Sequence, residues 1–132
     1  MLDTSTVIAL GEIEDPASLP DKSVISAITL AELSVGPLVA VDDDVRAARQ
    51  EHLQQAEADF DVFVFDEQCA RDFGGVAAAL RAAGRKAGAR AYDALIAASA
   101  IAYGVPLYTC NPGDFEGIPR LDLRLIPHPR RL

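Results

Sequence analysis

The sequence lacks the features of several large protein classes. It contains no tryptophan and only two cysteines, Cys69 and Cys110, which form no C-x-x-C pair. This spacing argues against a disulfide scaffold and against a cysteine zinc site. No apolar run reaches the roughly 20 residues that a membrane-spanning helix needs, and no basic segment precedes an apolar run at the N-terminus. We therefore expect a protein that resides in the cytoplasm and does not interact with membranes.

Basic residues are also scarce. Lys and Arg number 12 against 20 Asp and Glu, which gives a formal net charge of −8. Because non-specific binding to nucleic acid depends on Lys and Arg neutralising phosphates, this chain is not expected to coat nucleic acid. It favours cations and basic partners instead. Half of its 132 residues are hydrophobic, which is enough for a buried core in one domain spanning residues 1–132.

Common catalytic and nucleotide-binding motifs are missing. The chain has no G-x-x-x-x-G-K-[ST] loop, no G-x-G-x-x-G loop and no G-x-S-x-G elbow. The segment Asp3-Thr4-Ser5-Thr6 lacks the second acid of the D-x-D-x-T pattern found in haloacid-dehalogenase-like phosphotransferases. The two histidines stand alone, so no pattern supports histidine-centred catalysis.

Short apolar strands alternate with helices along the chain. We expect strands at 2–5, 23–27, 60–65, 105–109 and 123–126, and helices at 6–10, 29–33, 44–58, 67–83 and 92–103. Gly36-Pro37 is expected to end the helix that begins at Thr29, and residues 85–90 are expected to form an exposed loop. The helix at 92–103 is apolar on almost every side and should be buried. This alternation predicts an α/β fold, a three-layer sandwich with a central parallel sheet.

Four acidic residues are candidates for a functional site: Asp3, Glu32, Asp93 and Asp114. Asp3 and Asp114 come after expected strands, where parallel sheets bind ligands. Glu32 lies in the first turn after the second strand, and Asp93 lies at the start of the apolar helix at 92–103. Each also has a purely structural interpretation. Asp3 can cap a helix, and Thr29-x-x-Glu32 has the spacing of a capping box. Asp93 suits the N-terminal end of a helix dipole, and Asp114 suits a turn.

The structural interpretation weakens if the four carboxylates converge. Two like charges about 4 Å apart repel by about 4 kcal/mol at an effective dielectric constant near 20. Such a cluster persists only if a cation neutralises it or one acid holds a proton. Carboxylates without His or Cys partners favour Mg²⁺ or Mn²⁺. A convergent cluster would therefore indicate phosphoryl-transfer or phosphodiester chemistry.

Four motifs in fixed order span essentially the whole chain. They are Leu2-Asp3-Thr4-Ser5-x-x-Ile8, Ser26-x-Ile28-Thr29-x-Ala31-Glu32-Leu33-x-x-Gly36, Asp93-x-Leu95-Ile96-Ala97-Ala98-x-Ala100 and Gly104-x-Pro106-Leu107-x-Thr109-x-Asn111-x-x-Asp114-Phe115. This series resembles the PIN domain and, more narrowly, the VapC ribonuclease toxins of type II toxin–antitoxin modules. The resemblance implies a PIN-like α/β sandwich and Mg²⁺-dependent endoribonuclease activity, with Mn²⁺ as a substitute ion.

The resemblance also implies roles for individual residues. All four acids would be catalytic and metal-binding: Asp3 and Asp93 would contact the metal directly, Glu32 would act through water, and Asp114 would complete the pocket. The polar side chains that would support them are Thr4, Ser5, Thr109 and Asn111.

Partners follow from the same resemblance. The substrate would be RNA, and the chain would pair as a homodimer. A VapB-like antitoxin would place a C-terminal segment that contains an arginine across the pocket. Because the protein is acidic, RNA would need a local basic strip, for which the candidates are Arg85, Lys86 and Arg90.

Two other interpretations remain open. The chain could be a catalytically silent PIN-type module that only binds protein, or another Mg²⁺-dependent phosphotransferase built on a doubly wound sheet. The presence of all four acids favours the ribonuclease over the silent module. The absent D-x-D-x-T pattern weighs against the phosphotransferase.

Overall fold

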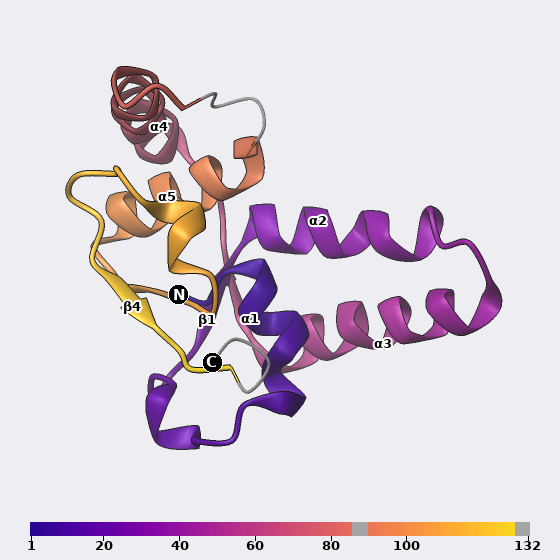
Figure 1. The fold of residues 1–132 in the computed structure, drawn as a ribbon. Helices are drawn as coiled ribbons and strands as arrows, with labels where there is room; N and C mark the ends of the chain where they lie inside the picture. Colours follow the sequence, from indigo (N-terminus) through magenta and orange to yellow (C-terminus); the bar gives the residue numbers. More distant parts are fainter. Residues whose placement is uncertain (86–89, 129–132) are drawn as a thin grey trace.

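The computed structural model describes residues 1–85 and 90–128 (Figure 1). Its strands are β1 (Val24–Ser26), β2 (Asp61–Phe63), β3 (Leu107–Thr109) and β4 (Leu123–Leu125). Its α-helices are α1 (Thr4–Ala9), α2 (Ala27–Leu38), α3 (Asp43–Asp59), α4 (Glu67–Ala82) and α5 (Ala91–Tyr103). Short 3-10 helices are η1 (Leu10–Glu12), η2 (Pro16–Ser18) and η4 (Pro112–Phe115).

Leu2 joins two pairs of parallel strands at the centre of the sheet. β1 pairs with β2 and β3 pairs with β4, both in parallel register. Leu2 forms parallel bridges to Ile25 on one side and to Tyr108 on the other. The order across the sheet is therefore β2, β1, Leu2, β3, β4, which confirms the predicted parallel α/β arrangement. The first strand is reduced to this single bridging residue.

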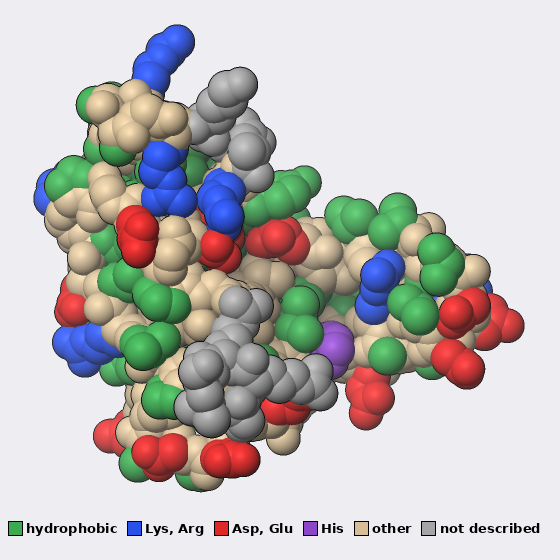
Figure 2. Space-filling model, viewed as in Figure 1, with side chains coloured by type: hydrophobic (Ala, Val, Ile, Leu, Met, Phe, Trp, Pro, Cys, Tyr) green, Lys and Arg blue, Asp and Glu red, His purple; other side chains and the backbone are tan. Residues whose placement is uncertain are grey.

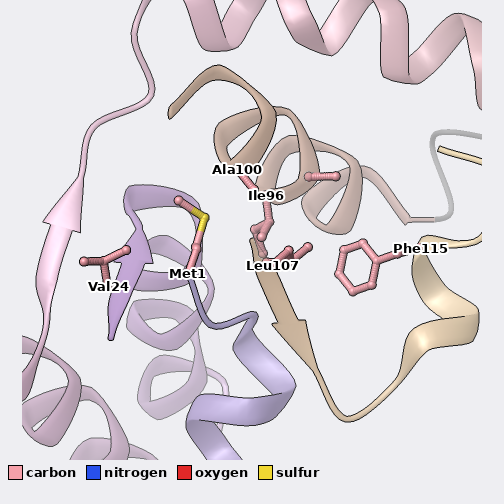
Figure 3. Close-up of a cluster of buried hydrophobic side chains, with 7 residues drawn as sticks. Met1, Val24, Ile96, Ala100, Leu107 and Phe115 are labelled. Atoms are coloured by element: carbon pink, nitrogen blue, oxygen red, sulfur yellow. The ribbon is translucent and has the colours of Figure 1, made fainter. Parts of the chain in front are cut away.

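Side chains that alternate along the strands fill a separate core on each face of the sheet. Val24 and Leu107 belong to one cluster with Ile96 of α5 and Phe115 of η4, and Figure 3 shows Ile96 and Phe115 beside Leu107. Their neighbour Ile25 joins the other cluster, together with residues of α1, α2 and α3. α4 lies outside α5, and a third small cluster joins these two helices. Helices thus cover both faces, as expected for a three-layer sandwich.

α5 and α2 differ in how much of each helix the core covers. The middle of α5 is buried, and Ile96, Ala97 and Ala100 are each 0% exposed, which confirms the expected buried helix, although Tyr92 at its N-terminal end is exposed. α2 and α3 instead project together as an arm away from the sheet (Figure 1). Large apolar side chains at the end of this arm, including Leu38 and Val41, are exposed. No helix in the described residues is long and apolar enough to cross a membrane.

Two expectations about helix ends were wrong. The first helix starts at Thr4 rather than Thr6, because the strand before it ends at Leu2 and Asp3 already serves as the N-cap. α2 also continues through Gly36-Pro37 to Leu38. Side chains of α3 stabilise this last turn: Arg49 Nη1 donates to the Gly36 carbonyl at 2.9 Å, and Arg46 Nε donates to the Pro37 carbonyl at 3.4 Å. These bonds satisfy carbonyls that a helix end otherwise leaves without partners.

Gly104 ends α5 in the left-handed conformation, with φ of 66°. A Cβ added there would meet nothing within 4 Å, so Gly104→Ala should destabilise the fold through backbone strain alone, by about 1 kcal/mol. Gly74→Ala in α4 is the matched control, since its Cβ also meets open space and Ala favours a helix by about 1 kcal/mol. Urea denaturation of both variants should therefore give shifts of opposite sign. A stabilising Gly104→Ala would contradict the strained ending.

Candidate active site

The four predicted acids lie on one edge of the molecule. Asp3 follows the central bridge residue, Glu32 lies on α2, Asp93 is the third residue of α5, and Asp114 lies in η4. Each of these segments begins just after a strand except α5, whose N-terminal end approaches the same edge. Figure 2 shows acidic and basic side chains gathered side by side on this part of the surface. The spatial arrangement follows from the parallel sheet, since the carboxyl ends of its strands share one edge.

Asp3 is buried, with 2% of its surface exposed, and its carboxylate is surrounded by donors. Oδ1 accepts from the backbone N–H of Thr6 at 3.0 Å and from the Thr6 hydroxyl at 2.6 Å. Oδ2 accepts from the Thr109 hydroxyl at 2.7 Å and from the Ser5 hydroxyl at 2.9 Å. Asp3 is thus the N-cap of α1, as its structural interpretation proposed, and it is also held rigidly at the acidic edge.

Glu32 is half-buried and is not part of a capping box. The N-cap of α2 is Ser26, whose hydroxyl accepts from the Ile28 N–H at 3.0 Å. Glu32 Oε1 instead accepts from the Thr4 hydroxyl at 2.7 Å. The capping-box interpretation was therefore wrong, because α2 starts two residues before Thr29. Burial raises the pKa of Glu32, the Thr4 hydrogen bond opposes this shift, and the charge of Asp3 adds to it.

The carboxyl group of Asp93 has a strongly raised pKa. Its pKa is raised to about 6, first by burial and then by the negative charges of Asp114, Glu32 and Asp3. Arg90 opposes the shift but is the smallest of these causes. Because the charges of all three other acids act on Asp93, the four carboxylates lie near one another, and we call this group of Asp3, Glu32, Asp93 and Asp114 the acidic pocket.

Asp114 is paired with an arginine. Arg90 Nη1 contacts Asp114 Oδ1 directly and lies 3.9 Å from Asp93 Oδ2. Arg90 was predicted to bind RNA, but in the structure its guanidinium contacts these two acids. Arg85, predicted for the same role, donates to the backbone carbonyls of Gly113 and Glu116. Lys86, the third candidate, lies outside the described residues.

The predicted polar supports divide into two groups. Thr4, Ser5 and Thr109 each donate a hydrogen bond to an acid of the pocket. Asn111 does not: its backbone N–H donates to Thr109 Oγ1 at 2.9 Å, whereas its buried side-chain Oδ1 has no donor among the described residues. Asn111 instead lines a cavity of about 930 Å³ beside α1 and α3.

Thr6 is a site residue that the sequence reasoning missed. Its hydroxyl donates to Asp3 Oδ1 at 2.6 Å and accepts from the Cys110 N–H at 3.2 Å. It therefore connects the first acid to the chain that follows β3. The signal was present in the sequence, since Thr6 stands three residues after Asp3, where an N-cap carboxylate meets the N–H it accepts from.

The donor set of the pocket suits a hard divalent cation. All four candidate ligands are carboxylates, the ligand type that Mg²⁺ and Mn²⁺ prefer, and burial together with the charges of the other three acids raises the pKa of Asp93. Among the described residues, no three acids, histidines or cysteines are already arranged to hold an ion. Both oxygens of Asp3 carry two hydrogen bonds each, and Arg90 holds Asp114. The residue types therefore suit a divalent metal ion. Binding the ion would require some of these hydrogen bonds and the Arg90–Asp114 contact to be replaced by contacts with the metal.

Known proteins match this chain over almost all of its length. The sequence model of the PIN domain matches residues 1–121. Ribonuclease VapC5 of Mycobacterium tuberculosis (strain ATCC 25618 / H37Rv) is 37% identical over 120 residues, which cover 89% of this chain and 86% of that protein. Ribonuclease VapC of Rickettsia bellii (strain RML369-C) is 32% identical over 130 residues, which cover 96% of each.

Solved structures give the same answer. The crystal structure of VapBC-5, a member of the VapBC family of toxin–antitoxin systems from Mycobacterium tuberculosis, matches with a TM-score of 0.78 and 33% identity, covering 96% of this chain and 95% of that chain. VapBC2 of Rickettsia felis, bound to a DNA fragment from its promoter, matches with a TM-score of 0.74 and 27% identity, covering 95% and 96%. The chain belongs to the PIN-domain family, and within it to the VapC group.

Proposed function

We propose that this protein is a Mg²⁺-dependent endoribonuclease and the toxin of a toxin–antitoxin pair. The observation that carries the proposal is the all-carboxylate pocket, in which burial and the charges of three other acids raise the pKa of Asp93 to about 6. Membership of the VapC group supports RNA as the substrate, because the relatives that match are ribonucleases.

Asp3 and Asp93 would contact the cation directly, Glu32 would act through water, and Asp114 would complete the pocket. The bound ion, Mg²⁺ or Mn²⁺ in its place, would polarise the phosphodiester and lower the pKa of a water molecule. The remaining tasks fall to the protein. Thr4, Ser5, Thr6 and Thr109 fix the orientation of Glu32 and Asp3 through the hydrogen bonds described above.

The partner would be a VapB-like antitoxin with an arginine in its C-terminal segment. Support comes from the similarity to chains of VapBC complexes and from the acidic pocket itself. An arginine fork can bind two carboxylates at once, so an antitoxin arginine would silence the site by satisfying its acids. We further propose that the toxin acts as a homodimer in the cytoplasm, where it meets both RNA and the antitoxin.

The proposal is tested by incubating the purified chain, freed of any bound antitoxin, with a panel of structured and single-stranded RNAs. We expect internal cleavage in Mg²⁺ and in Mn²⁺, and none when a chelator is added. Addition of an arginine-containing antitoxin peptide should stop the reaction. If every RNA stays intact with Mg²⁺ present, and the protein still binds its antitoxin, the silent binding module becomes the better description.

A further inference from the structure

The N-terminal end of α5 carries a residue that local helix chemistry disfavours. Arg90 is the N-cap of this helix, and its side chain forms no capping hydrogen bond. Ser, Thr, Asp and Asn are the residues that cap well at this position. A cation is also unfavourable next to the positive end of the helix dipole. Because both rules oppose an arginine here, its presence calls for a reason outside the helix.

That reason lies in the acidic pocket. The Arg90 guanidinium contacts Asp114 Oδ1 and lies 3.9 Å from Asp93 Oδ2. The side chains are only partly exposed, at 47% for Arg90, 27% for Asp93 and 30% for Asp114, so solvent screens their attraction less than at a free surface. Arg90 thus occupies the two acids of the pocket that have the fewest other hydrogen-bond donors among the described residues.

We infer that Arg90 is a built-in competitor for the divalent cation: it neutralises Asp114 and Asp93 in the metal-free protein and has to be displaced when the metal binds. This inference rests on the proposed function, because it concerns the same metal site. It also changes the role of Arg90, which the sequence suggested as an RNA-binding residue. In the metal-free protein its partner is the pocket rather than a phosphate.

The charge balance explains why such competition would weaken metal binding without preventing it. Within residues 1–85 and 90–128, Arg90 is the one cation that forms an ion pair with any of the four carboxylates, and the pKa of Asp93 stays raised despite this arginine. The pocket therefore remains negative and still attracts a cation. Displacement also frees the guanidinium next to the site where an RNA phosphate would lie, and arginine binds phosphate well. RNA and metal should consequently assist each other's binding through Arg90.

The test is calorimetric titration of the metal-free full-length chain with Mn²⁺ at low salt and without RNA. Arg90→Gln should bind Mn²⁺ roughly threefold to tenfold more tightly than the wild type, because the competitor is gone. Arg90→Lys, which keeps the charge, should stay closer to the wild type. Arg85→Gln is the matched control: it removes the same charge nearby, but Arg85 contacts backbone carbonyls, so its affinity should change by less than about twofold.

The outcomes separate this inference from the proposed function. Equal Mn²⁺ affinity in the wild type and Arg90→Gln would overturn the inference and leave the metal site standing. Weaker binding by Arg90→Gln would also overturn it, since Arg90 would then support the bound ion. If neither protein binds Mn²⁺, both the inference and the metal-dependent function fail. Binding by Arg90→Gln alone would be the strongest support for competition.

Discussion

Replacing Asp93 with Asn is expected to abolish RNA cleavage while making the metal-free protein more stable. Asn keeps the shape of the side chain but removes the charge that would hold the cation. Loss of one such electrostatic contact reduces catalytic rates by about two orders of magnitude or more. The stabilisation follows from the raised pKa of Asp93, which records an unfavourable negative charge in the folded pocket.

The gain in stability should depend on pH with a defined sign. The pKa of Asp93 is about 6 in the folded protein against an ordinary value of 3.8. The folded state therefore holds its proton at a pH where the unfolded chain has lost it, so wild-type stability falls as pH rises from about 4 through 6. Asp93→Asn does not titrate at this position, so its stability does not fall in this way as the pH rises. Above that range it should be more stable than the wild type by about 1–2 kcal/mol, allowing for partial exposure of the side chain.

Chemical denaturation in chelator, at about pH 4.5 and about pH 7.5 on either side of the transition, measures this difference. Asp44→Asn is the matched control, because Asp44 also lies in the first turn of a helix, α3, but is exposed. It should be slightly destabilised through its lost dipole interaction. A stability of Asp93→Asn equal to that of the wild type at both pH values would show that the pocket carries no net repulsion. Cleavage within about twofold of the wild type would remove Asp93 from the catalytic site.

The sequence predicted those parts of the fold that depend on local pattern. The parallel α/β arrangement and the buried helix at 92–103 follow from apolar periodicity, and Gly104 marks the end of that helix as expected. The end of α2 was predicted wrongly because it depends on tertiary contacts. Arg46 and Arg49 reach the carbonyls of its last turn from α3, and no pattern within residues 27–38 records this.

The same distinction applies to the candidate site. Motif order selected four acids that the structure brings close enough to act on one another, and their catalytic roles stay a prediction. Motif order could not predict which hydrogen-bond or ion-pair partner each acid has. Glu32 fits a capping box by spacing, yet it accepts from Thr4 of another helix. Arg90 belongs to a basic cluster by sequence, yet its charge is turned toward Asp114. Hydrogen-bond partners far apart in the chain are set by packing, so only the structure reveals them.

Asp3→Asn is expected to abolish cleavage as well, but with the opposite effect on stability. Repulsion among converging carboxylates argues that neutralising any one of the four should stabilise the metal-free protein. The structure separates Asp3 from Asp93 in this respect. The Asp3 carboxylate accepts four hydrogen bonds, two on each oxygen, whereas the described contacts of Asp93 supply only Arg90 at 3.9 Å.

The side chain of Asn has only one acceptor oxygen, whereas the Asp3 carboxylate accepts hydrogen bonds on both Oδ1 and Oδ2. If its NH₂ group replaces Oδ1, it faces the Thr6 N–H; if it replaces Oδ2, the Ser5 and Thr109 hydroxyls lose their acceptor. Either orientation leaves a buried donor without a partner, which costs about 1–3 kcal/mol. We therefore expect Asp3→Asn to destabilise the metal-free protein by about that amount, even though Asn caps helices as well as Asp does.

Thr109→Val tests the same network from the other side. Thr109 is 0% exposed, donates to Asp3 Oδ2 at 2.7 Å and accepts from the Asn111 N–H at 2.9 Å. The nearly isosteric valine removes both hydrogen bonds and keeps a similar packing volume. Denaturation in chelator should show a loss for Thr109→Val and for Asp3→Asn, and a smaller combined loss in the double variant than the sum of the two, because they break one shared contact. Strictly additive losses would show that Asp3 and Thr109 are not coupled through this hydrogen bond. An Asp3→Asn variant as stable as the wild type would show that relief of repulsion offsets the hydrogen bonds lost at Asp3.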